Sequence, residues 1–187
     1  QLKLSQNAKQ VALGYNGSYS ISEYDELGRV TLVGQVTPSE PLPSPITRDL
    51  LDQETFPDNI SPYASEYSEI TKTDYNRATL PSYPGFNQQN LRGKVAVSMY
   101  ADSYADLNNG KATGVYYSYD VHGNVKDLLN YTYSAPADYS AYTMPVKHTS
   151  YGYDLISGKV NQVTYQPGQT DMFIHRYEYD ADNRITN

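Results

Sequence analysis

Four aspartates of this chain stand in the same local sequence, and their carboxylates are its first candidates for acid–base chemistry. Each aspartate follows a tyrosine and precedes a glycine or an asparagine by three or four positions. The copies are Tyr24, Asp25 and Gly28; Tyr119, Asp120 and Gly123; Tyr153, Asp154 and Gly158; and Tyr179, Asp180 and Asn183. An enzyme needs one active site and not four, so four equivalent carboxylates indicate a repeated structural element instead.

Two other groups of side chains have the atoms to bind a metal ion. The histidines, which lack the short spacing of metal ligands, are His122, His148 and His175. An oxygen-rich segment before Gly110 contains Asp102, Asp106, Asn108 and Asn109. An EF-hand loop would need a terminal glutamate that does not follow here. We therefore interpret this segment as a solvated turn, with calcium binding as the alternative, and expect no enzyme activity, no metal and no cofactor.

The element that would position each aspartate is a tight turn between two antiparallel strands. Asp favours the first position of a type I turn, because its carboxylate accepts hydrogen bonds from backbone N–H groups just ahead, and Gly favours the position with positive φ. A type I turn followed by a left-handed residue is a common hairpin connection. We predict positive φ at Gly28, Gly123 and Gly158, and also at Asn183, since Asn tolerates that conformation. The extra residue Ser157 predicts a longer third loop.

The residues beside the turns have the pattern of strands. In the last three copies another tyrosine precedes the Tyr-Asp pair by two positions, which places both rings on one face of a strand. After the turn, Val125 and Leu128 are three positions apart, and a β-bulge between them would return both to one face. Equivalent positions should align between repeats, so we expect one packed face formed by Tyr117, Val125, Tyr151, Val160, Tyr177 and Ile185.

A further stretch carries only the second half of the pattern. Gly93, Lys94 and Val95 repeat the Gly-Lys-Val that closes the third copy, and a tyrosine follows seven residues after the glycine in both. We interpret Gly93 as another hairpin exit whose Tyr-Asp half has changed.

Proline content divides the chain into three regions. Residues 1–37 have the pattern of N-terminal hairpins, with an Asn-Gly turn signal at 16–17 and the first Tyr-Asp copy. Residues 38–62 contain six prolines, which interrupt a strand ladder, and we interpret them as a linker or covering segment with a short helix over about 45–53. Residues 63–187 form the repeat array, with turns expected near 105–110, 120–123, 134–139, 154–158, 167–170 and 180–183.

Composition narrows the range of partners. The 187 residues include 21 Tyr, 3 Phe and no Trp, and the mean hydropathy is −0.66, which favours amphipathic sheet faces over a thick apolar core. A net charge of −7 without a basic cluster argues against nucleic acid and anionic membranes as partners. Cysteine is absent, which excludes disulfides, and no apolar run is long enough for a transmembrane helix.

The pattern Tyr-x-Tyr-Asp-x-x-Gly-x-Val resembles the RHS repeat, also called the YD repeat, of large bacterial proteins such as those of Bacteroidetes. The similarity covers residues 89–187 well and 18–36 moderately. It implies a β-rich strip that winds, in full-length relatives, into a hollow shell around a C-terminal toxin or effector. Relatives often end the shell with an Asp-Pro-x-Gly-Leu self-cleavage motif. This chain has no Asp-Pro and ends at Asn187 within a post-turn strand, so we expect an interior segment of a longer protein.

We therefore predict an all-β array of antiparallel β-hairpins that forms a curved sheet with little helix. The resemblance implies a non-enzymatic structural segment of a large secreted or cell-surface protein, with the other repeats and the effector as its partners. The alternative is a surface module that binds carbohydrate or another partner on exposed tyrosines. Residues 1–5 are not a signal peptide, so a secreted parent would carry that signal elsewhere. Because unpaired strand edges invite pairing, we expect the isolated segment to self-associate.

Overall fold

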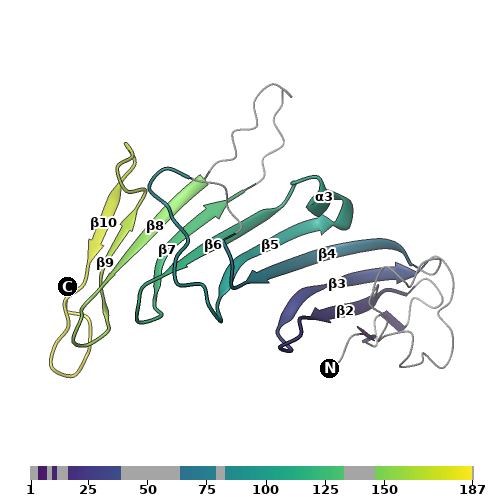
Figure 1. The fold of residues 1–187 in the computed structure, drawn as a ribbon, viewed down its shortest axis with the longest axis horizontal. Coiled ribbons are helices and arrows are strands. Elements are labelled where there is room, and N and C mark those ends of the chain that lie inside the picture. Colours follow the sequence, from purple (N-terminus) through teal and green to yellow (C-terminus); the bar gives the residue numbers. More distant parts are fainter. Residues whose placement is uncertain are drawn as a thin grey trace. The chain divides into compact units, whose positions relative to one another are not determined.

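The protein is built of β-strands that follow one another along the chain (Figure 1). The computed structural model describes residues 4–7, 10–11, 17–38, 64–78, 83–132 and 146–186. Its strands are β1 (Leu4–Ser5), β2 (Tyr19–Tyr24), β3 (Val30–Pro38), β4 (Ala64–Tyr75), β5 (Val95–Ser103), β6 (Thr113–Tyr119), β7 (Val125–Tyr131), β8 (Val146–Tyr153), β9 (Val160–Tyr165) and β10 (Phe173–Arg176). A short helix, α3 (Tyr104–Asn108), lies between β5 and β6.

The ten strands form one antiparallel sheet in which spatial order equals sequence order, β1 to β10. Such a meander needs only local connections, because each strand pairs with its neighbours in the chain. The prediction of an all-β array of antiparallel hairpins is confirmed. In a meander every second connection lies at the same end of the strands. The turns after β6, β8 and β10 therefore lie at one end of the sheet.

The chain forms two compact units, and the first comprises Gln1–Thr73 and Met99–Ala112. Its core contains four apolar side chains that are almost fully buried: Ile21, Leu32, Val36 and Ile70. Tyr67 and Tyr104 pack against this cluster with their ring centres 5.7 Å apart, so α3 covers part of the core. Gly34 allows the close approach of β4, because a Cβ there would lie 2.6 Å from Cδ1 of Ile70.

The second unit comprises Asp74–Ser98 and Thr113–Asn187. Its core cluster is smaller and more aromatic, with Leu91, Ala96 and Tyr119 buried and with Tyr117 and Val125 packed against them. Leu129, in the middle of β7, is also buried. This composition agrees with the amphipathic sheet faces that the tyrosine content predicts, since tyrosine combines an apolar ring with a polar hydroxyl.

A β-bulge follows the turn in three hairpins, at equivalent positions. In β6–β7, Tyr119 pairs with Val125 whereas Ser118 pairs with Asp127, so one residue of β7 has no partner. The equivalent extra residues in β2–β3 and β8–β9 are Thr31 and Asn161. The predicted bulge is confirmed, and it brings the two apolar residues after each turn to the same face.

The prediction for residues 105–110 is wrong in part, because a short helix forms there and not a turn alone. The side chain of Ser103 accepts a hydrogen bond from the backbone N–H of Asp106, and its hydroxyl donates to the Asp106 carboxylate at 2.7 Å. This is a capping arrangement that starts a helix. The helix ends before Gly110, whose φ is 72°. The Asp106 carboxylate also lies 3.6 Å from Nζ of Lys111, so its charge is compensated within the protein.

Three sequence predictions concern segments outside the described residues. They are most of the proline-rich region 38–62 with its short helix, the first half of the Asn-Gly turn at 16–17, and the turn near 134–139. The turn near 167–170 is described: Gly168 has a φ of 75°, and the N–H of Gln169 donates to the carbonyl of Gln166.

Candidate functional site

The four Tyr-Asp turns are the repeated site of this chain, and the turn at Asp120 shows their construction. The N–H of Gly123 donates to the carbonyl of Asp120, and the N–H of Asp120 donates to the carbonyl of Asn124. Oδ1 of Asp120 accepts hydrogen bonds from the N–H groups of His122 and Asn124, both at 2.9 Å. One carboxylate oxygen therefore satisfies two backbone donors that the tight turn would leave without partners.

Two other turns repeat this pattern closely. Oδ1 of Asp25 and Oδ1 of Asp180 each accept from the N–H groups two and four residues ahead, at 2.8–3.0 Å. The turn at Asp154 is one residue longer, as Ser157 predicts: its carboxylate accepts from the N–H groups of Ile156 and Ser157 and from the Ser157 hydroxyl. The longer loop thus accommodates its extra residue, because the Ser157 hydroxyl supplies an additional donor to the Asp154 carboxylate.

The residue that closes each turn has a left-handed backbone. The φ angles of Gly28, Gly123 and Gly158 are 78°, 94° and 70°, and that of Asn183 is 68°, as predicted. A β-branched residue is strongly disfavoured in this conformation, whereas Gly adopts it without a Cβ clash.

The turns keep their four carboxyl groups ionised. At Asp25 and Asp120 burial raises the carboxyl pKa, but hydrogen bonds from the turn outweigh it, and the net pKa is lowered. At Asp154 and Asp180 the largest cause is a backbone N–H donor within the turn, which lowers the pKa. A carboxylate with a lowered pKa is a poor general base at neutral pH, so these shifts favour a structural role.

The tyrosine of each Tyr-Asp pair in the second unit joins one hairpin to the preceding one. The hydroxyl of Tyr153 donates to the carbonyl of Val125, at 2.7 Å, and Val125 is the first residue after the previous turn. The two equivalent bonds run from Tyr119 to Val95, at 3.0 Å, and from Tyr179 to Val160, at 2.7 Å. The same geometry recurs in all three bonds, so the tyrosine hydroxyl links each repeat to the preceding one.

The structure supplies the missing first half of the pattern that ends at Val95. β4 ends at Tyr75, and the next residue, Asn76, takes the position of the aspartate: its N–H donates to the carbonyl of Lys94, as the N–H of Asp120 does to Asn124. The side-chain oxygen of Asn76 accepts from the N–H of Gly93 at 2.8 Å. Gly93 is therefore a hairpin exit, as the sequence predicts, with a long excursion between the two halves of its turn.

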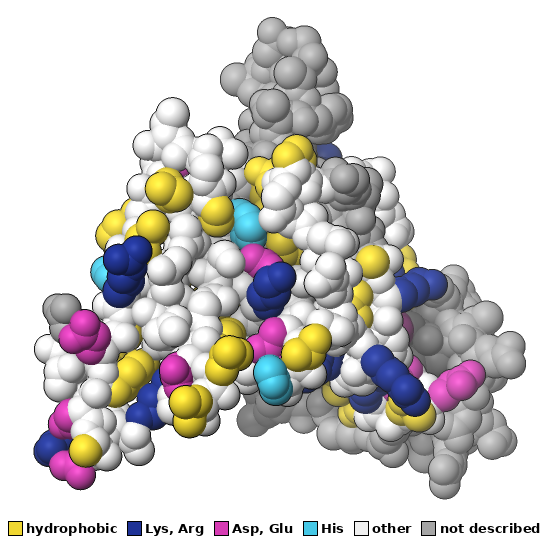
Figure 2. Space-filling model, turned by 60° about the vertical axis from the view of Figure 1, so that its left-hand side comes forward, with side chains coloured by type: hydrophobic (Ala, Val, Ile, Leu, Met, Phe, Trp, Pro, Cys, Tyr) yellow, Lys and Arg dark blue, Asp and Glu magenta, His cyan; other side chains and the backbone are white. Residues whose placement is uncertain are grey.

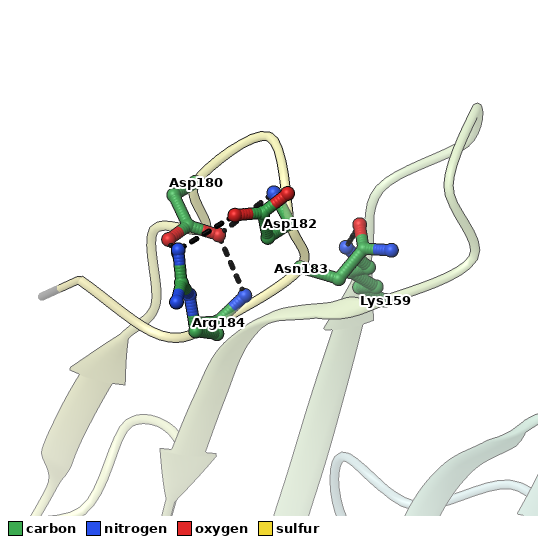
Figure 3. Close-up of polar contacts among 5 residues, drawn as sticks. All are labelled: Lys159, Asp180, Asp182, Asn183 and Arg184. Atoms are coloured by element: carbon green, nitrogen blue, oxygen red, sulfur yellow. Dashed lines mark hydrogen bonds and ion pairs between the residues drawn. The ribbon is translucent and has the colours of Figure 1, made fainter.

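The residue before the post-turn valine or isoleucine has one of two roles. In three turns it bonds to its own aspartate through a side-chain nitrogen, 2.7–2.9 Å from Oδ2; these residues are Arg29, Asn124 and Arg184. In the other two, a lysine reaches forward to the next turn. Lys94 contacts the turn at Gly123, and Lys159 contacts Asn183. Figure 3 shows both roles side by side, with Arg184 on Asp180 and Lys159 on Asn183.

Five of the six residues predicted to share a packed face are partly buried, and strand pairing explains their alignment. Tyr117 pairs with Leu128, which pairs with Thr149, so Tyr117 and Tyr151 lie on one face of the sheet. Val125, Val160 and Tyr177 are partly buried as well. Ile185 is an exception to the prediction, because it is 61% exposed. Ile185 lies outside the named strands and pairs with Tyr179 in an isolated bridge.

One polar cluster of the second unit is not visible in the sequence. Nε2 of His148, in β8, lies 2.9 Å from Oδ1 of Asp127 in β7, and both side chains are nearly buried. Burial raises the pKa of Asp127, but the hydrogen bonds from His148 and Ser150 together with the nearby positive charges outweigh it, and the net pKa is lowered. The His148 backbone exchanges hydrogen bonds with Gln166, and the Phe86 ring meets the imidazole edge-on. Because both side chains are nearly buried and hydrogen-bonded to each other, we assign the cluster a structural role.

The most exposed apolar side chains lie at the tips of the turns: Leu27, Val121, Leu155 and Ile156. Less exposed ones lie on strands and include Val33 in β3 and Phe173 and Ile174 in β10. On the face that Figure 2 shows, hydrophobic side chains lie in small groups separated by polar ones. Among the described tyrosines, Tyr100 alone has an exposed side chain. The remaining described rings are at least partly covered.

The described residues contain no group of three His, Asp or Glu side chains placed to hold a metal ion. In the same part of the chain, no helix is both long and apolar enough to cross a membrane.

Comparison with known proteins finds similarity only among solved structures. No family of known proteins matches the chain, and no curated protein matches it either. Among solved structures, it is similar to a chain in the crystal structure of TcdB2-TccC3-Cdc42, with 13% sequence identity and a TM-score of 0.26. The similarity covers 91% of this chain and 9% of that chain. At this TM-score the similarity carries no argument about function.

Proposed function

We propose that this chain is a structural segment of a large secreted or cell-surface RHS/YD-repeat protein. In that protein, the repeats would form a β-shell around a C-terminal toxin or effector. The observation that carries the proposal is the bond from each Tyr-Asp tyrosine to the first carbonyl after the preceding turn, as in Tyr153 and Val125. The bond recurs in the same direction three times, so it can join any number of hairpins in sequence.

The construction of the turns also supports a scaffold. The turn carboxylates bond to donors of their own turns, and their lowered pKa values suit permanent charge more than proton transfer. The second unit is a thin sheet with a small core, so further stability would come from neighbouring repeats, as in other repeat proteins. The carbohydrate-binding alternative requires exposed aromatic rings, and no specific observation on the described tyrosines favours it.

Protease protection in the full-length protein that carries this segment tests the proposal. If the repeats enclose an effector, the polypeptide after the repeats should resist limited proteolysis in the intact protein and be digested quickly when expressed alone. Electron microscopy of the same sample should show hollow particles. Equal digestion of the downstream polypeptide in both forms would contradict enclosure.

A further inference from the structure

Two lysines fill equivalent spaces between consecutive turns of the second unit. Nζ of Lys94 lies 4.9 Å from the centre of the Tyr119 ring and 3.0 Å from the carbonyl oxygen of Gly123. Nζ of Lys159 lies 4.8 Å from the centre of the Tyr179 ring and contacts Oδ1 of Asn183. In both places an ammonium group sits over the tyrosine of the next repeat and bonds to an oxygen of the residue that closes its turn.

The turn between these two pairs lacks such a lysine. The equivalent residue is Asn124, which is shorter and uses its side-chain nitrogen to bond its own Asp120 at 2.9 Å. Among the described residues, no lysine or arginine lies over the ring of Tyr153, the next tyrosine. The position over the Tyr153 ring, which a lysine ammonium group occupies in the other two repeats, therefore holds no cation from the described residues.

An open pocket marks that position. A pocket of about 300 Å³ is lined by the two turns and by the ring between them, including Asp120, Asn124, Tyr153, Asp154 and Gly158. Glycine geometry gives independent support for this assignment. A Cβ added at Gly123 would lie 2.9 Å from Nζ of Lys94, whereas a Cβ added at Gly158 would meet nothing within 4 Å. The volume that the ammonium occupies beside Gly123 is thus empty beside Gly158.

We propose that this pocket, between the Asp120 and Asp154 turns, binds a primary alkylammonium group, supplied by a lysine side chain of a polypeptide partner. The ammonium would lie over the Tyr153 ring and donate to the carbonyl of Gly158, as Lys94 donates to Gly123. The carboxylates of Asp120 and Asp154 make the pocket electronegative.

The surroundings of the pocket favour a lysine within a polypeptide over a free amine. Leu155 and Ile156 line the pocket and are 87% and 96% exposed. A peptide can cover these side chains with apolar residues next to its lysine, and burial of that apolar surface adds to affinity. A small amine would leave both side chains in water. The proposal stands on the second unit alone and does not depend on the proposed shell.

An NMR titration of the ¹⁵N-labelled chain with butylammonium chloride tests the ammonium site. We expect saturable shifts at the amides of Ile156, Ser157 and Gly158, with sodium chloride at equal ionic strength and 1-butanol producing none. Asn124→Lys should weaken binding at least tenfold, because the new lysine fills the pocket from within. Thr170→Lys is the matched control, since it adds the same charge at an exposed position outside the pocket and should leave binding unchanged.

A second pair of variants separates the aromatic ring from the hydroxyl bond. Tyr153→Phe and Tyr153→Leu both lose the bond to Val125, but only the phenylalanine keeps a ring for the cation. Tyr153→Phe should bind butylammonium within about threefold of the wild type, as the ring face is retained, and Tyr153→Leu should not bind it measurably. Equal binding by the two variants, or by wild type and Asn124→Lys, would overturn the site.

The last arm identifies the source of the ammonium. An acetylated Leu-Lys-Leu amide peptide should bind at least tenfold more tightly than butylammonium, and Leu155→Ser should reduce peptide binding by a larger factor than it reduces butylammonium binding. Equal affinities for peptide and amine would contradict the assignment to a polypeptide partner.

Discussion

The hydroxyl of Tyr153 donates a hydrogen bond to the carbonyl oxygen of Val125 at a distance of 2.7 Å. Tyr153 ends β8 and Val125 begins β7. The bond therefore joins the two strands at the end of the sheet where the Tyr-Asp turns lie. The same relation joins Tyr119 to Val95 and Tyr179 to Val160. These bonds convert a series of local hairpins into a coupled array.

Removal of one such hydroxyl should weaken the fold without disturbing packing. Tyr153→Phe keeps the ring and leaves the Val125 carbonyl without its donor, so we expect the free energy of unfolding to fall by about 1 kcal/mol. Urea unfolding measures the change. Tyr177→Phe is the control, because Tyr177 is also partly buried and its hydroxyl has no protein partner among the described residues. An equal loss in both variants would contradict a specific role for the Tyr153 hydroxyl.

Two glycines with similar backbone conformations should respond differently to alanine. Gly123→Ala and Gly158→Ala each place a Cβ at positive φ, which costs about 1–2 kcal/mol. At Gly123 the Cβ also displaces the Lys94 ammonium from its place over Tyr119, which adds about 0.5–1 kcal/mol. In a Lys94→Met background this added loss should vanish. Thermal unfolding of the two glycine variants and their parent, in the wild-type and the Lys94→Met backgrounds, gives the comparison. An extra loss that persists without Lys94 would show that the lysine is not its cause.

Acid should destabilise the array through the turn aspartates. Their carboxyl pKa values are lower in the folded chain than the ordinary aspartate value of 3.8, so their contribution to stability is complete above that value and is lost as the pH falls through the folded pKa values. We expect the free energy of unfolding to decrease below about pH 4. Asp120→Asn should reduce the slope of this decrease, and Glu26→Gln, an exposed carboxyl in the first turn, serves as control. A slope unaffected by Asp120→Asn would contradict the assignment.

The nearly buried and the exposed ion pairs of the second unit should contribute differently to the free energy of unfolding. Asp127→Ala leaves the nearly buried His148 imidazole without its acceptor, and we expect a loss of about 1–3 kcal/mol in urea unfolding. Asp171→Ala breaks the ion pair with Lys147, in which both side chains are close to half exposed. This change should alter the free energy of unfolding little. A larger loss from Asp171→Ala would reverse this ranking and contradict the structural role of the buried cluster.

Sequence alone predicts what depends on neighbouring residues in the chain. The turn aspartates, the positive φ at Gly123 and Asn183 and the bulge after the turn follow from local hydrogen bonding and sterics. The structure has the bulge after three of the four Tyr-Asp turns. The repeats also predict an array of antiparallel hairpins, whereas the order of the strands in the sheet comes from the structure alone.

What the sequence does not predict depends on contacts between distant residues. The pair of His148 and Asp127 is 21 residues apart and needs the β7–β8 register to form. Asn76 is not an aspartate, so the sequence does not identify it as the turn partner of Gly93. Strand pairing brings the two residues together. Ile185 occupies a core position of the pattern, yet one bridge to Tyr179 leaves it mostly exposed.

The central claim is that consecutive hairpins are joined through the tyrosine hydroxyl, and NOE spectroscopy of the labelled chain tests it most directly. We predict cross-peaks from the Tyr153 ring protons beside the hydroxyl to the α-protons of Val125 and Lys126, and from those of Tyr179 to Val160 and Asn161. Rings that show cross-peaks only to residues of their own hairpin would contradict the coupling and the repeat array built on it.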